Sequence, residues 1–153
     1  ATIITLAGVF AASAQAHQET NISKWQFSQT GAEWKAVKTA GKPAKLQLTA
    51  DRSTIAADGC DLTFITVSLT DKNGTLCPDA DHSLEFKVTG AATFNSVCNG
   101  DATSLEVFTE PTMKLFHGQL VVVVQASAAP GKATLTVKDK NTGIRATLPI
   151  TVK

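Results

Sequence analysis

From Leu46 onward, apolar and polar residues alternate with a period of two, and this pattern constrains the fold more than any other feature of the chain. The longest run is DLTFITVSLT (61–70), in which Ile65, Val67 and Leu69 fall on one face and mostly polar residues on the other. A period of two is typical of a β-strand that is buried on one face. Further strands are predicted at KLQLTA (45–50), SLEFKV (83–88), ATLTV (133–137) and ATLPITV (146–152).

The other strand and turn signals complete this picture. QLVVVVQAS (119–127) has a central apolar run that predicts a strand buried on both faces, and Pro149 predicts an edge or a bulge in the last strand because it cannot donate to a ladder. No alternation of strands and helices is present, which argues against Rossmann and barrel folds. Short strands with turns between them predict an all-β, immunoglobulin-like antiparallel β-sandwich over residues 45–153. The turn signals are ADG (57–59), KNG (72–74), CNGD (98–101), APG (129–131) and NTG (141–143).

The first 44 residues do not follow this pattern. Residues 1–16 are apolar and end in Ala14-Gln15-Ala16, which predicts a signal peptide and export to the periplasm, the cell surface or the medium. This stretch is too short to span a bilayer, so no membrane span is expected. Residues 17–44 show no sustained period and run into KTAGKPAK (38–45), a linker pattern. We expect this N-terminal segment to be largely unstructured.

Composition excludes several classes of function. The net charge of +1 over 153 residues gives no broad field that would favour nucleic acid. Cys60, Cys77 and Cys98 show no Cys-x-x-Cys spacing and have no histidine pair nearby, so zinc is not expected. At most one disulfide can form among them, and its pairing stays open. DADHS (79–83) lacks the glycine and the final acid of a calcium loop, so no metal and no cofactor are expected.

No residue is assigned a catalytic role. The histidines His17, His82 and His117 are isolated in the sequence, and no nucleophile elbow or phosphate-binding loop occurs. Glycoside hydrolysis would need two carboxylates and a cleft that raises the pKa of one of them. The acids instead fall in turns or on the polar side of strands, where solvated turn residues are expected. They are Asp51, Asp58, Asp61, Asp71, Asp79, Asp81, Glu85, Asp101, Glu106 and Glu110.

A carbohydrate-binding module would present aromatic rings to the sugar. The phenylalanines of residues 46–153 are expected mainly in the core, although Phe64 lies on the opposite face of its strand from Val67. Phe94 and Phe108 are the least clearly patterned and are the first candidates for a sugar platform. No ligand-binding residue can be assigned beyond these two.

The stretch FNSVCNGDATS (94–104) combines a thiol, an Asn-Gly pair and an acid. Asn99-Gly100 can take the positive φ angles of a tight hairpin turn, and Asp101 can accept hydrogen bonds from nearby amides. We therefore interpret the stretch as a turn. Cys98 is expected to be a buried thiol, as free cysteines usually are, or a disulfide partner of Cys60 or Cys77.

Several segments in order carry a family resemblance: ADG before a long strand, DKNG after it, NGD after the next strands, and FHG before the Val-rich strand. Residues 45–153 resemble the immunoglobulin-like C-terminal domain of family 2 glycoside hydrolases of the β-galactosidase type. The resemblance implies an accessory module whose partners are other domains of a glycoside hydrolase, and through them glycans. The catalytic glutamates of the family reside in a barrel of about 250 residues, and no position here inherits them.

The N-terminal segment resembles the same family separately. Trp25-Gln26-Phe27 and Trp34-Lys35-Ala36-Val37 are similar to the start of its first sugar-binding-type domain, although the chain then departs into KTAGKP. The chain thus resembles the two ends of a longer enzyme. A second hypothesis is a structural or adhesive module, because the pattern from Ala57 to Gly74 is also similar to bacterial immunoglobulin-like repeats of invasin-type surface proteins. No second repeat occurs in the chain.

Overall fold

The computed structural model of the chain describes residues 22–27 and 34–153. The predicted signal peptide at 1–16 and His17 lie outside the described residues. The chain divides into two units, residues 1–40 and 41–153. In the first unit, β1 (Ile22–Phe27) and β2 (Trp34–Lys38) pair as an antiparallel hairpin, with Trp25 opposite Ala36. Because residues 17–44 show no sustained period in the sequence, these two strands were not predicted.

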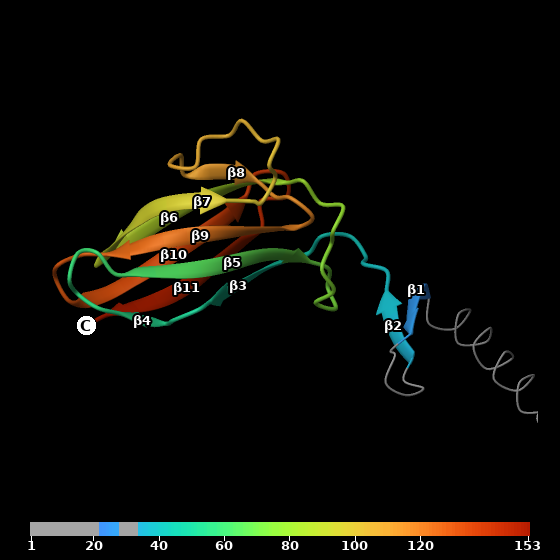
Figure 1. The fold of residues 1–153 in the computed structure, drawn as a ribbon, viewed down its shortest axis with the longest axis horizontal. Coiled ribbons are helices and arrows are strands. Elements are labelled where there is room, and N and C mark those ends of the chain that lie inside the picture. The colour runs from blue at the N-terminus through green and yellow to red at the C-terminus, as the bar shows by residue number, and fades with distance from the viewer. Residues whose placement is uncertain (1–21, 28–33) are drawn as a thin grey trace, which may run out of the picture. The chain divides into compact units, whose positions relative to one another are not determined.

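The second unit is a β-sandwich (Figure 1). One sheet has four strands in the order β3-β5-β9-β7, and the other has five in the order β4-β11-β10-β6-β8. The strands are β3 (Lys45–Ala50), β4 (Thr54–Ile55), β5 (Leu62–Thr70), β6 (Ser83–Gly90), β7 (Ala92–Cys98), β8 (Thr112–Lys114), β9 (Gln119–Ala126), β10 (Gly131–Asp139) and β11 (Arg145–Val152). All pairs are antiparallel except β4 with β11, a parallel pair of two residues. The predicted all-β sandwich is confirmed.

The core lies between the two sheets and contains the side chains that the alternation selects. Ile65, Val67 and Leu69 of β5 are fully buried in one sheet, and Leu84 and Phe86 of β6 are buried in the other. Each fully buried Val, Leu or Ile side chain contributes roughly 1.5–3 kcal/mol relative to an exposed one. The rest of the fully buried set includes Ile55, Val97, Met113, Val122, Val124, Leu135, Val137 and Ile150.

The expectation that QLVVVVQAS is buried on both faces is wrong. In β9, Leu120, Val122 and Val124 are buried, whereas Val121 and Val123 are only partly covered. The strand is central within its sheet, between β5 and β7. A two-layer sandwich nevertheless covers only one face of each sheet, so the outward valines of this strand remain accessible.

Pro149 lies where the sequence predicted, at an open edge. It is opposite Thr134 of β10, and the short β4 pairs with β11 only at Thr151 and Val152. The side of β11 away from β10 is therefore unpaired at Pro149, so a missing N–H costs no ladder bond there.

The tight turn before β9 closes the Phe116–Gln119 hairpin and depends on two positive φ angles. His117 has φ 51° and Gly118 has φ 74°, and Phe116 and Gln119 exchange both backbone hydrogen bonds. A Cβ atom at Gly118 would lie 2.2 Å from the carbonyl oxygen of Cys77, which is far inside van der Waals contact. Gly118 is therefore required both by its backbone conformation and by the close approach of the segment before β6.

The first prediction concerns Gly118→Ala, with Gly74→Ala as the matched control. Gly74 has φ 84° and no atom within 4 Å of its missing Cβ, so its substitution should cost about 1 kcal/mol of backbone strain alone. Gly118→Ala adds the clash and should lower the free energy of unfolding by at least ~2–3 kcal/mol. Urea unfolding of both variants measures the difference. Equal losses would show that the approach to Cys77 does not constrain the turn.

Candidate functional site

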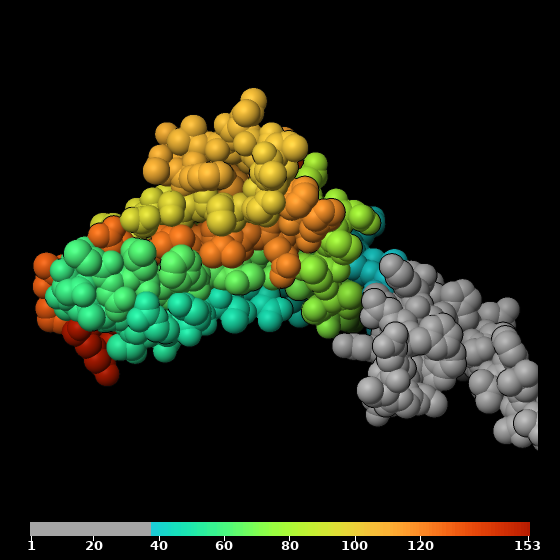
Figure 2. All heavy atoms as spheres, in the orientation of Figure 1, coloured from blue at the N-terminus to red at the C-terminus, as the bar shows by residue number. Residues whose placement is uncertain are grey.

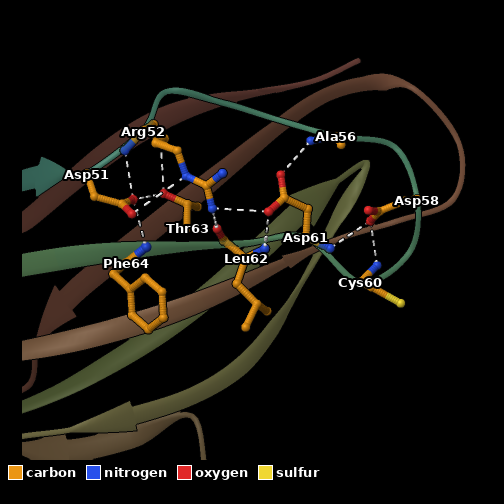
Figure 3. Close-up of polar contacts among 9 residues, drawn as sticks. All are labelled: Asp51, Arg52, Ala56, Asp58, Cys60, Asp61, Leu62, Thr63 and Phe64. Atoms are coloured by element: carbon orange, nitrogen blue, oxygen red, sulfur yellow. Dashed lines mark hydrogen bonds and ion pairs between the residues drawn. The ribbon is translucent and has the colours of Figure 1, made fainter.

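The segment between β3 and β5 holds a cluster of hydrogen-bonded polar side chains (Figure 3). The carboxylate of Asp51 accepts hydrogen bonds from the hydroxyl of Thr63 at 2.7 Å and from the N–H of Phe64 at 2.9 Å. The Nη2 of Arg52 donates to Asp61 Oδ1 at 3.1 Å and also to the carbonyl of Leu62. Together these contacts tie the start of the loop to the first residues of β5.

The other side of this loop is closed by two carboxylates. Asp61 Oδ2 accepts the N–H of Ala56 at 2.8 Å, and Asp58 Oδ1 accepts the N–H groups of Cys60 and Asp61 at 2.8 and 2.7 Å. The backbone bond from Ala56 holds the pKa of Asp61 below its ordinary value, and the bonds from Cys60 and Asp61 do the same for Asp58. These acids are committed to the backbone of their own loop.

A second polar cluster joins the loop before β6 to the end of β10. Asp139 is fully buried, and its Oδ2 lies 2.8 Å from Nδ1 of His82. The same carboxylate accepts the N–H of Asn141 at 2.8 Å and the hydroxyl of Thr142. Burial raises the pKa of Asp139, but the bonds from Thr142, His82 and Asn141 outweigh it and leave the pKa below its ordinary value. Since 57 residues separate the pair, the sequence showed His82 only as an isolated residue.

Four aspartates of the sandwich share one local geometry. The side chains of Asp58, Asp71, Asp101 and Asp139 each accept the N–H of the second residue after them, at 2.8–2.9 Å. This is the Asx turn that such residues form at strand ends. The tripeptide Asp-Lys-Asn occurs at both 71–73 and 139–141, and this repeat is a sequence signal that could have identified Asp139 as a turn residue.

The prediction that the turn acids are solvated is wrong for Asp71. Its side chain is buried and accepts the N–H groups of Gly41 at 2.9 Å, Asn73 at 2.8 Å and Thr75 at 2.9 Å. The bond from Gly41, followed by that from Thr75, lowers the pKa of Asp71. The carboxylate thus fixes the chain entering β3 to the turn after β5.

A general acid for glycoside hydrolysis needs a carboxyl group with a raised pKa. Every shift that is resolved among the described acids is downward, in Asp51, Asp58, Asp61, Asp71, Asp101 and Asp139. Within the residues that the structure describes, no group of three histidine, cysteine or acidic side chains could hold a metal ion. The same part of the chain contains no helix long and apolar enough to cross a membrane.

The structure separates the two phenylalanines that were candidates for a sugar platform. Phe94 points inward and stacks on Phe86, with ring centroids 6.2 Å apart and planes 11° apart. Phe108 is 52% exposed, on the loop between β7 and β8. The expectation of a core position is wrong for Phe64 and Phe116, which are both exposed.

The interpretation of CNGD as a tight hairpin needs correction. Gly100 has φ 79°, and Asp101 accepts bonds from Thr103, as expected of a turn. The turn, however, opens the long loop 99–111, which crosses from β7 in one sheet to β8 in the other.

The interpretation of Cys98 is wrong on both counts, since its thiol is neither buried nor in a disulfide. All three cysteines are free: Cys60 and Cys98 are exposed, and Cys77 is buried. Cys98 is exposed because it pairs with Val121 on the outward side of the four-stranded sheet.

The outward side of the four-stranded sheet is almost free of charge, and we call it the neutral face. Lys45, at one end of β3, is its single charged residue among the described strands. Phe64 is 47% exposed near its centre, and Val121 and Val123 are partly exposed beside it. The other members are Gln47, Thr49, Leu62, Thr66, Ser68, Thr93, Asn95, Ser96, Cys98, Gln119 and Gln125.

The loop 99–111 adds apolar side chains at the β7 edge of this sheet. Leu105 is 98% exposed and Val107 58%. The backbone of the loop is held in place, since the N–H of Val97 donates to the carbonyl of Phe108 at 2.8 Å and the N–H of Lys114 donates to the Glu106 carboxylate at 3.2 Å. In Figure 2 the loop projects from the sandwich as a ridge. Large apolar side chains gathered on an ordered surface segment indicate an interaction site.

The fold defines the class of the chain as an immunoglobulin-like β-sandwich. The model of the glycoside hydrolase family 2 C-terminal domain 5 matches residues 46–145. The chain therefore belongs to glycoside hydrolase family 2, in which it corresponds to the C-terminal domain and not to the catalytic barrel.

Two relatives illustrate this membership. The chain is 48% identical over 102 residues to the β-galactosidase BoGH2A of Bacteroides ovatus, which is 67% of this chain and 12% of that protein. A crystal structure of a family 2 glycosyl hydrolase from Bacteroides cellulosilyticus superimposes with a TM-score of 0.77 at 32% identity, over 84% of this chain and 17% of that one. The chain thus spans only a small part of these proteins.

The adhesive hypothesis finds a likeness in fold alone. The adhesin InvE of Yersinia pseudotuberculosis has a TM-score of 0.50 at 22% identity, over 70% of this chain and 26% of that one. The family match begins at residue 46, so the resemblance of residues 25–37 to the first domain of the family stays a prediction.

The second prediction concerns Asp139→Asn. The pKa of Asp139 is lowered in the folded chain, so its contribution to stability is complete above its unfolded pKa of about 3.9 and is lost as the pH falls through the folded pKa. The variant should lose about 1–3 kcal/mol at around pH 7 because three donors lose a buried, charged acceptor. The difference in free energy of unfolding between the variant and the parent chain should become smaller at acidic pH. Urea unfolding across pH measures it, with exposed Asp79→Asn as the control. A gap that is independent of pH would contradict the role of the ionised carboxylate.

Proposed function

We propose that this chain is a non-catalytic accessory module of an exported family 2 glycoside hydrolase of the β-galactosidase type. Its role in carbohydrate degradation would be to pack against the other domains of the same polypeptide and support the barrel. The observation that carries the proposal is the difference between the outward faces of the two sheets.

The neutral face supports docking to a protein domain. Uncharged Thr, Ser and Gln side chains around partly exposed valines and Phe64 require no ion to be desolvated when they are covered. On the five-stranded sheet the outward side chains include Lys87, Lys132, Lys138 and Arg145, which suit solvent better. Depletion of charge at the centre is typical of protein interfaces.

The length of the relatives supports the choice of occupant. The matched segment is 12% of BoGH2A, so most of such a protein lies outside the sandwich and can supply the covering surface. The apolar ridge of loop 99–111 leaves the same sheet at β7, and we propose that it contacts the neighbouring domain as well. The apolar sequence of residues 1–16, with its Ala-Gln-Ala ending, supports export.

The state of the carboxylates supports a non-catalytic role. Glycoside hydrolysis needs an acid with a raised pKa beside a second carboxylate. The described acids whose pKa values shift are instead held in their ionised form by hydrogen bonds. In Asp58, Asp61 and Asp71 the largest contribution comes from backbone N–H groups, and in Asp51, Asp101 and Asp139 from threonine hydroxyls. Replacing one of them should reduce stability and not remove an activity.

The third prediction is that the purified chain does not hydrolyse an aryl β-galactoside. Release of the aryl alcohol is followed beside a complete family 2 enzyme as positive control. Turnover that copurifies with the chain and disappears in Asp61→Asn or Asp51→Asn would contradict the proposal. A trace activity that is unchanged in both variants belongs to a contaminant and leaves the prediction upheld.

A further inference from the structure

The outward side of the five-stranded sheet carries five cations and one carboxylate, and we call it the basic face. Its charged members are Glu85, Lys87, Lys114, Lys132, Lys138 and Arg145. It has a shallow hollow of about 210 Å³, lined by Glu85, Lys87, Thr136, Lys138 and Arg145. Three of the five cations therefore converge on one depression formed by β6, β10 and β11.

The strand register fixes how these charges lie. Arg145 is directly opposite Lys138, and Lys138 is opposite Glu85 on its other side. In the next row Lys87 is opposite Thr136. Side chains directly opposite each other on a sheet have Cβ atoms about 4.5–5.5 Å apart, and diagonal neighbours lie about 7–8 Å apart. A single anionic group seated near Thr136 is thus within reach of all three cations.

The chain leaves these cations without enough negative charge of its own. Like charges directly opposite on a sheet, as Arg145 and Lys138 are, destabilise it. None of the ion pairs among the described residues includes Lys87, Lys138 or Arg145. Acids are abundant in the chain, but most lie in turns, where several are committed to backbone N–H groups. Glu85 alone offsets part of the positive charge in the hollow.

We propose that this hollow binds the carboxylate groups of an acidic polysaccharide. The planar guanidinium of Arg145 matches a carboxylate with two parallel hydrogen bonds, and the ammonium groups of Lys87 and Lys138 add point charges. The hydroxyl of Thr136 can bond to a sugar hydroxyl. The basic face has no aromatic side chain among its described outward residues, so it lacks the stacking surface that single-stranded nucleic acid uses.

The choice of a glycan rests on the proposed carbohydrate-related role, whereas the anion site rests on the hollow alone. Exposed charge contacts are individually weak. A single sugar acid should therefore bind too weakly to be measured, and a polymer that presents many carboxylates should be retained through repeated contacts. The interaction should also weaken steeply with salt because the groups are exposed.

The experiment uses this chain and immobilised polygalacturonate at low ionic strength, about 20 mM. The test variant is Lys138→Gln with Arg145→Gln. The matched control is Lys114→Gln with Lys132→Gln, which removes the same charge from the same face but outside the hollow. We expect at least a fivefold loss of affinity in the test variant and less than a twofold loss in the control. Fully methyl-esterified polygalacturonate, which has the same backbone without the charge, should not retain the chain.

Three results would overturn the proposal: no retention of the parent chain, an equal loss of affinity in both double variants, or equal retention on the methyl ester. Tighter retention on single-stranded DNA than on polygalacturonate would overturn the assignment to a glycan. The substituted side chains lie on the surface, and thermal melting of each variant confirms that the fold is intact. None of these outcomes bears on catalysis or on the neutral face, so this proposal and the proposed function fail separately.

Discussion

A sandwich of two sheets buries one face of each sheet, and the outward faces of this molecule must therefore meet solvent or a partner. The inward faces are filled by the alternating apolar side chains, such as Ile65 and Val67 of one sheet and Leu84 and Phe86 of the other. The two outward faces differ in charge. One carries almost no charge and exposes Phe64, and the other collects cations around a hollow. This asymmetry is the basis for assigning each face a different kind of partner.

The difference in charge between the two outward faces depends on the carboxylates, because most of them lie in turns and at strand ends and not on either face. Asp71 and Asp139 are buried at strand ends, and Asp58 and Asp61 close the loop that leads into β5. In each case backbone N–H groups that would otherwise lack partners are satisfied by a charged acceptor. These aspartates thus stabilise the turns of the domain by accepting hydrogen bonds. The same hydrogen bonds lower the pKa values of the carboxyl groups.

The sequence predicted the sandwich, the core of β5 and β6, and the edge position of Pro149, because each depends on local spacing alone. It did not predict what depends on contacts between distant segments. Burial of Val121 and Val123 was overestimated because an apolar run looks the same whether one or both faces of its strand are covered. The pairing of His82 with Asp139 joins segments 57 residues apart, which no local pattern reports. The exposure of Cys98 likewise follows from the register of β7 on β9.

The central claim is that the neutral face is covered by another domain of the same polypeptide, and the thiol of Cys98 on that face tests it most directly. Alkylation of Cys98 is compared between this chain and the same sequence placed within a complete family 2 polypeptide, with exposed Cys60 as the internal reference. If the neutral face is covered, Cys98 should react at least tenfold more slowly in the complete polypeptide, and the rate of Cys60 should change little. Val123→Lys should restore the fast rate, because covering a lysine costs its hydration, and Thr134→Lys on the other sheet should not. Equal reactivity of Cys98 in both proteins would contradict the account.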